Sequence, residues 1–188
     1  MIRSLFSLSL ILAMALPASA AETAKETVHA IAMEGGKPAV VSGNISSGKK
    51  IPLDWAAKSS VACFPGTRFE MFDGNHVFYR VELPARSEMK IKLVPRDRSK
   101  VINLYALRQG AGGDQPVPPD VDSAISAEAS YPLYARTGTR TIKNPDDGTR
   151  KIDFISVNKP YSILIGVAGG KGSVEGEYEL SVAVDKRQ

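Results

Sequence analysis

Apolar and polar residues alternate in several short runs along this chain, and a period of two is typical of half-buried β-strands. The run 77–83 is the clearest, because its odd-numbered positions are apolar whereas Arg80 and Glu82 occupy the opposite face. The run 89–93 alternates in the same way with two lysines. Further strands are predicted at 39–45, 68–72, 101–107, 152–157, 161–167 and 178–184. The inward positions of these runs predict a core that contains Tyr79, Val81, Leu83, Ile91, Leu104, Ile163, Ile165, Tyr178 and Leu180.

The segment 110–149 breaks this pattern. It is rich in Gly, Pro and Asp, and it predicts a long loop with a short helical turn near 120–128 and a strand at 131–136. Loops of this length in a compact domain are either functional or disordered, and the sequence leaves both open. Together the short strands predict an all-β fold, a single antiparallel β-sandwich or jelly roll with one long insertion loop.

The N-terminus carries the pattern of a secretory signal peptide. Arg3 provides a short basic region, residues 5–16 form an apolar run too short for a membrane span, and residues 18–20 fit a small-x-small cleavage site. We therefore expect a mature chain that begins near Ala21, is periplasmic or secreted, and does not span the membrane. The predicted organisation is a signal peptide at 1–20, an N-terminal segment at 21–37, and a β-sandwich domain at 38–188 with the long loop at 110–149.

Composition narrows the classes of partner and the redox chemistry. Lys and Arg number 24 against 20 Asp and Glu, a net charge of +4 that falls to +3 when Arg3 leaves with the signal peptide. This mildly basic balance indicates no nucleic-acid partner. Cys63 is the single cysteine, so an intramolecular disulfide is excluded. A buried thiol, a free thiol and a bridge to another chain all remain open.

Three regions of the chain resemble the bacterial pre-peptidase C-terminal domain family. They are 76–83, 101–107, and the pair formed by 161–167 and 176–182. The resemblance implies a β-sandwich without catalytic residues that binds protein, glycan or a parent enzyme. Asn103 stands where the family favours Asp, and Asn75-His76 where an acidic residue is common, so an inherited calcium site is not implied. In architecture and compartment the chain is also similar to the periplasmic inhibitors of goose-type lysozyme.

Catalytic and cofactor motifs are weak. Residues 43–50 nearly spell a phosphate-binding P-loop, but Lys50 stands where Ser or Thr is needed and Pro52 follows, so a hairpin turn is predicted instead. A Cys-dependent hydrolase that pairs Cys63 with His29 or His76 stays as a minor alternative. We otherwise expect no enzyme activity, no cofactor and no metal. The turn 144–148 offers oxygen ligands for calcium, although its residues are equally typical of a turn.

Two binding hypotheses follow from the remaining residues. The first is a protein-binding module, in its most specific form an inhibitor of a lysozyme-type hydrolase, that uses the long loop with Tyr131, Tyr134 and Arg136 at the contact. The same aromatic residues could instead fasten the loop to the sandwich. The alternative hypothesis is that the chain binds an envelope polyanion or glycan through a run of basic residues. That run contains Arg86, Lys90, Lys92, Arg96, Arg98 and Lys100, partly neutralised by Glu88 and Asp97.

Overall fold

The computed structural model describes residues 26–58, 68–132 and 146–187. Its strands are β1 (Val28–Ala30), β2 (Ala39–Asn44), β3 (Lys49–Lys50), β4 (Asn75–Leu83), β5 (Ser87–Pro95), β6 (Ile102–Gly110), β7 (Ser126–Ser130), β8 (Arg150–Ser156), β9 (Tyr161–Gly169) and β10 (Glu177–Lys186). The helical elements are α1 (Asp54–Lys58) and the 3-10 turns η1 (Ile45–Ser47) and η2 (Phe69–Met71). The all-β prediction is confirmed.

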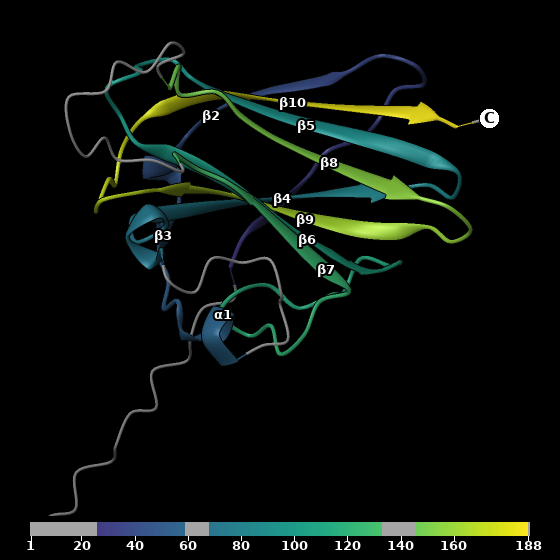
Figure 1. The fold of residues 1–188 in the computed structure, drawn as a ribbon, viewed down its shortest axis with the longest axis horizontal. Coiled ribbons are helices and arrows are strands. Elements are labelled where there is room, and N and C mark those ends of the chain that lie inside the picture. Colours follow the sequence, from purple (N-terminus) through teal and green to yellow (C-terminus); the bar gives the residue numbers. More distant parts are fainter. Residues whose placement is uncertain (1–25, 59–67, 133–145, 188) are drawn as a thin grey trace, which may run out of the picture.

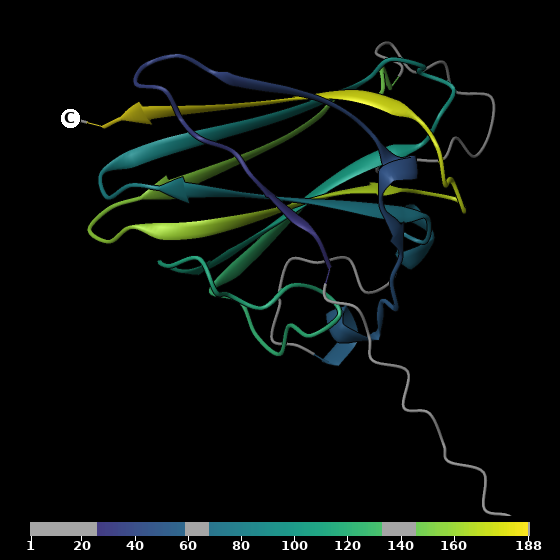
Figure 2. The ribbon, with the colours of Figure 1, turned by 180° about the vertical axis from the view of Figure 1, so that it is seen from behind.

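Two sheets pack face to face as a sandwich (Figure 1). One is six-stranded in the order β1-β4-β9-β6-β7, with β3 beside β4, and the other is four-stranded in the order β2-β10-β5-β8. Pairing among the described strands is antiparallel, except that β1 runs parallel to β4. The chain after β1 passes from the six-stranded to the four-stranded sheet along the side seen in Figure 2. The segment 21–37 thus contributes β1 to the sandwich.

The main core fills the space between the two sheets. All nine residues predicted for it are buried there, with at most 4% of any one exposed. The hydroxyls of Tyr79 and Tyr178 meet across the core at 2.8 Å, so the two sheets share a buried hydrogen bond. Such a pair satisfies polar atoms whose burial would otherwise be costly.

A second apolar cluster covers the outer face of the six-stranded sheet. Phe78, Tyr105 and Leu164 project to this face and pack against residues of α1, of η2 and of the loop after β6. The covering residues include Trp55, Ala56, Met71, Phe72, Val117 and Val121. Figures 1 and 2 show α1 and the segment 111–125 together beneath that sheet. The central strands are therefore buried on both faces, and the first part of the long loop is a packed layer.

Four local predictions are corrected. Residues 68–72 contain the 3-10 turn η2, because the adjacent Met71 and Phe72 are both buried and a half-buried strand buries only every second residue. Near 120–128 the chain is a loop that leads into β7, with no helical turn. Tyr131 and Pro132 are not in a strand, and the rest of 131–136 lies outside the described residues. Residues 43–50 form no hairpin, because β2 and β3 belong to different sheets and η1 crosses between them.

The predictions for the signal peptide and for the single cysteine concern residues beyond the described ranges. The signal peptide at 1–20 and Cys63 both lie outside them. Within residues 26–58, 68–132 and 146–187, no helix has the length and apolar character that crossing a membrane requires.

Candidate binding surface

A pocket of about 480 Å³ opens in the layer that covers the six-stranded sheet. The stretch 49–52 forms one wall and the loop 114–120 forms the other. Glu26 and the residues of these two walls line it: Lys49, Lys50, Ile51, Pro52, Asp114, Gln115, Pro116, Val117, Pro118, Pro119 and Asp120. Its volume falls in the range of small-molecule and peptide side-chain sites.

The pocket has an apolar base, and its two walls carry charges of opposite sign. Ile51, Val117 and Pro118 are buried and supply the apolar surface. Lys50 on one wall and Asp120 on the other are exposed, and neither takes part in an ion pair among the described residues. Lys49 is held 3.1 Å from Glu26. One wall is therefore basic and the other acidic.

Arg80 on β4 fixes the acidic wall to the sheet. Its Nη1 donates to Gln109 Oε1 at 3.0 Å and to Ser162 Oγ at 3.1 Å, and its Nη2 donates to the carbonyl of Gln115 at 2.9 Å. Gln109 in turn donates from Nε2 to the carbonyl of Pro116 at 2.8 Å. Side chains of β4, β6 and β9 thus hold the loop backbone, which leaves the pocket shape preformed.

The residues predicted for the long loop are only partly described. Tyr131 is half-buried, and its ring lies 5.7 Å from that of Phe72 in an edge-on arrangement within the second cluster. This position fits a side chain that fastens the loop. Tyr134 and Arg136 lie outside the described residues.

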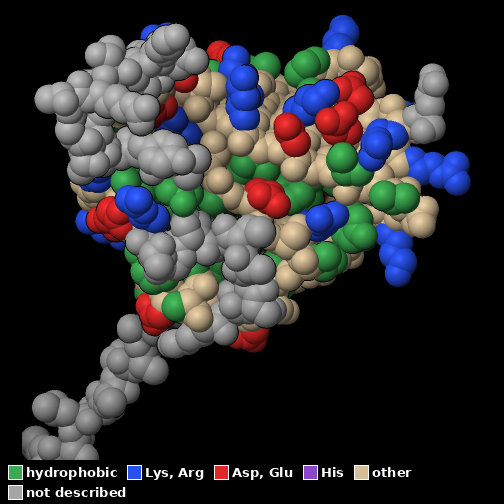
Figure 3. All heavy atoms as spheres, viewed as in Figure 1, with side chains coloured by type: hydrophobic (Ala, Val, Ile, Leu, Met, Phe, Trp, Pro, Cys, Tyr) green, Lys and Arg blue, Asp and Glu red, His purple; other side chains and the backbone are tan. Residues whose placement is uncertain are grey.

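The basic run lies on the four-stranded sheet and its adjoining turns, where Lys90, Arg96 and Lys100 have acidic partners. Lys90 is 3.5 Å from Glu88 and stands opposite Asp153, while Lys92 stands opposite Lys151. Beyond the strand, Arg96 approaches Glu177 at 3.8 Å, Lys100 bonds Glu175 at 2.9 Å, and Arg98 is exposed. Basic and acidic side chains stand next to each other over this sheet in Figure 3. Polyanion binding by the run stays a prediction.

His76, one of the two histidines offered for nucleophilic catalysis, is buried and engaged at both ring nitrogens. Nε2 lies 2.7 Å from the carbonyl of Phe72, and Nδ1 lies 2.9 Å from the hydroxyl of Tyr105. Burial lowers the pKa of His76 to about 4, so the ring is neutral near pH 7. One neutral tautomer satisfies both contacts, with Nε2 donating and Nδ1 accepting. His29 is exposed on β1 beside the ring of Tyr79.

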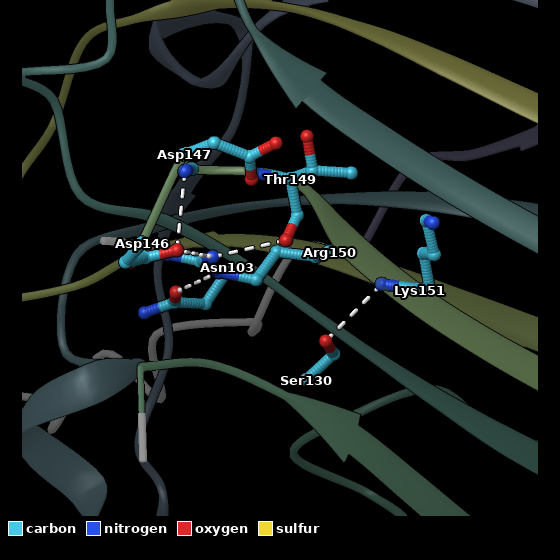
Figure 4. A network of polar contacts seen from close by, with 8 residues as sticks. Asn103, Ser130, Asp146, Asp147, Thr149, Arg150 and Lys151 are labelled. Carbon is cyan, nitrogen blue, oxygen red and sulfur yellow. Dashed lines mark hydrogen bonds and ion pairs between the residues drawn. The ribbon is translucent and has the colours of Figure 1, made fainter. Parts of the chain in front are cut away.

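Arg150, which no sequence pattern singles out, is buried beside the acidic turn before β8 (Figure 4). Its Nη1 and Nη2 donate to the two carboxylate oxygens of Asp146 at 2.7 and 3.0 Å, and its Nε donates to Asn103 Oδ1 at 3.0 Å. This contact lowers the pKa of the Asp146 carboxyl. Asp147 accepts from the backbone N–H of Thr149 at 2.8 Å. No group of three or more His, Cys, Asp and Glu residues that could hold a metal occurs in the described part of the chain.

Two features of the sequence indicate the pocket. Three prolines at 116, 118 and 119 stiffen the loop, and Arg80 is a charge on a strand whose neighbours are apolar. What the sequence could not show is that residues 49–52 form the facing wall, because that contact is long-range.

Comparisons with known proteins show only distant likenesses. No family model and no curated protein matches the chain. Among solved structures, it is similar to a periplasmic inhibitor of g-type lysozyme from Aeromonas hydrophila, with 15% identity, a TM-score of 0.44, and coverage of 86% of this chain and 98% of that one. It is also similar to the pre-peptidase C-terminal domain of a Bacillus anthracis collagenase, with 15% identity, a TM-score of 0.37, and coverage of 84% and 96%. A third is CorA, a surface-associated copper-binding protein of Methylomicrobium album BG8, with 9% identity, a TM-score of 0.49, and coverage of 86% and 99%. Both groups that the sequence resembles are represented among these structures.

Proposed function

We propose that this chain is an exported, non-catalytic binding protein that takes a loop of a partner protein into the pocket between residues 49–52 and 114–120. The observation that carries the proposal is the pocket itself, about 480 Å³ in volume, with an apolar base between a basic and an acidic wall. Protein contacts concentrate where a desolvated apolar centre is surrounded by a polar rim.

The charges of the two walls define the partner segment. A loop that fits presents an apolar side chain to Ile51 and Val117, with an acidic residue toward Lys50 and a basic residue toward Asp120. Opposite charges placed in this way fix the direction in which the segment lies.

The rigidity of the acidic wall also supports a binding role. Arg80 and Gln109 hold the backbone of the loop at Gln115 and Pro116. A binding surface that is already ordered loses less conformational entropy when a partner docks.

The proposal that the chain is not catalytic rests on the contacts that its buried histidine makes. Both ring nitrogens of His76 take part in structural contacts, and its lowered pKa keeps the ring neutral. A general base near pH 7 needs a nitrogen that can reach a substrate proton.

The partner to test first is a goose-type lysozyme, because the chain is similar in architecture and expected compartment to the periplasmic inhibitors of that enzyme. Affinity and inhibition of lytic activity are measured for the exported protein and for the double charge reversal Lys50→Glu/Asp120→Lys. Both side chains are exposed, so folding is unaffected, and we expect binding about tenfold weaker. Lys92→Glu on the four-stranded sheet is the matched control and binds as the parent does. Equal affinity of the pocket variant, or a loss confined to Lys92→Glu, would overturn the proposal.

A further inference from the structure

A second pocket lies at the end of the sandwich where β4 turns into β5 and β8 turns into β9. It has a volume of about 360 Å³ and is lined by Arg86, Ser156, Val157, Asn158 and Arg187. This is the end at which β10 finishes, near the C-terminus marked in Figure 1. It shares no residue with the pocket of the proposed function.

Two guanidinium groups line this pocket without neutralising partners. Arg86 and Arg187 are exposed, and no ion pair or side-chain hydrogen bond of either occurs within the described ranges. Their backbones are tied together, since Arg187 N–H donates to the carbonyl of Arg86 at 2.7 Å and Arg86 N–H donates to that of Val157 at 3.2 Å. The fold therefore places two positively charged side chains at one pocket.

The backbone of Arg86 has a conformation that is uncommon for residues other than glycine. Its φ of 54° lies in the left-handed region, where glycine or asparagine is favoured and a long side chain is strained. A turn that needed only the backbone conformation is better served by glycine. Arg86→Gly therefore removes the guanidinium while the conformation of the turn is retained.

The surroundings of the two arginines specify the anion further. Val157, 64% exposed, offers an apolar wall, and the Asn158 side chain is exposed beside it. Lys159 and Lys186 adjoin the pocket in sequence and add positive charge. Glu88 and Asp185, the acidic residues nearest in sequence to Arg86 and Arg187, stand opposite each other on the four-stranded sheet.

We propose that this pocket binds the phosphate group of a phosphorylated sugar. Guanidinium forks match the oxygens of a phosphate monoester. The volume exceeds that of a phosphate ion alone, so the attached sugar fits against Val157 and Asn158. The same chemistry is presented by a soluble sugar phosphate and by a phosphorylated lipid headgroup.

The test is an NMR titration of the exported protein with glucose 1-phosphate, and with glucose as the neutral control. The phosphate ester is expected to shift the amide signals of residues 86, 157, 158 and 187, and glucose is not. Binding to vesicles of phosphatidylcholine with and without phosphatidic acid then shows whether the phosphate group belongs to a lipid headgroup or to a soluble ligand. Binding to the phosphatidic acid vesicles as well as to glucose 1-phosphate indicates a lipid headgroup, and binding to glucose 1-phosphate alone indicates a soluble ligand.

Two variants each remove one guanidinium group from the pocket, and a third removes a positive charge elsewhere as a control. Arg86→Gly removes the guanidinium at a position whose φ suits glycine, so the fold is retained, and Arg187→Ala removes the other group. Each weakens binding of glucose 1-phosphate about tenfold. Lys171→Gly is the control, because Lys171 also has a positive φ, 52°, but lies in the β9–β10 connection at the other end of the sandwich. Undiminished binding in both arginine variants, or an equal loss in Lys171→Gly, would overturn the site.

Discussion

At the scale of single residues, a few buried polar side chains tie the covering layer to the sandwich. His76 bonds the carbonyl of Phe72 and the hydroxyl of Tyr105, and Asn103 donates to the carbonyl of Met71 at 2.7 Å. These contacts satisfy the carbonyls of Met71, the last residue of η2, and of Phe72, which follows it. A buried group left without its partner costs far more than a hydrogen bond gains, so these positions have large effects on stability.

The protonation of His76 makes stability depend on pH. Its pKa is about 4 in the folded chain against 6.5 in a free side chain, so the unfolded chain binds the proton more tightly. The contribution is complete above pH 6.5 and is lost as the pH falls toward 4, by up to about 3 kcal/mol. Urea unfolding at a series of pH values measures it. His76→Gln removes this part of the pH dependence, and an identical slope in both proteins would show that His76 is not responsible.

Leu104 tests the register of the central strand β6. It is fully buried in the main core, so Leu104→Ala should lower the free energy of unfolding by about 2–5 kcal/mol. Chemical denaturation measures the change. An unchanged midpoint would mean that the side chain does not face the core.

At the scale of elements, most strands could be predicted from the sequence, because their alternation reports which face is buried. Where strands β4, β6 and β9 are buried on both faces, the sequence shows it too, as near-continuous apolar runs such as Ile102–Leu107. Alternation carries no such information for the covering layer. η2 and the loop 114–120 owe their conformation to contacts with distant residues such as Arg80 and His76. The sequence pattern predicts a contact at Tyr131, Tyr134 and Arg136 of the long loop, which stays a prediction, whereas the pocket is lined by residues 114–120 of that loop.

Gly166 on β9 makes room for the ring of Tyr105, its cross-strand partner on β6. A Cβ at this position would lie 2.2 Å from Cζ of Tyr105, inside any permitted contact. Gly166→Ala should therefore lower the free energy of unfolding by about 1–3 kcal/mol or more. Gly113→Ala, where a Cβ meets nothing within 4 Å, is the matched control and should leave the thermal midpoint nearly unchanged. Equal midpoints for the two variants would contradict this packing.

Arg80 tests the attachment of the pocket wall. Arg80→Met removes the donors to Gln109, Ser162 and the Gln115 carbonyl. We expect faster amide hydrogen exchange in the loop around Gln115 and a loss of about 1–3 kcal/mol of unfolding free energy. Arg98→Met, at an exposed turn, should change neither quantity. Unaltered exchange in the loop of Arg80→Met would mean that the wall is held by apolar packing alone.

At the scale of the whole molecule, the chain is a sandwich with an added layer. The four-stranded sheet keeps a solvated outer face on which Lys90 and Lys92 alternate with buried residues, while the outer face of the six-stranded sheet is covered. The long loop thus builds part of the body of the protein in its described first half. The proposed protein-binding pocket lies in this layer, and the proposed phosphate pocket lies at an end of the sandwich.

The most direct test of the proposed function is a hydrogen-exchange footprint of the purified protein with and without goose-type lysozyme, or with another partner recovered by affinity capture. Docking in the pocket predicts slower exchange in the stretch 49–52 and in the loop 114–120, with the strands β5 and β8 unchanged. Protection confined to β5 and β8 would place the partner on the four-stranded sheet instead. That result would contradict the account, as would a bound partner that leaves both walls of the pocket exchanging at their free rates.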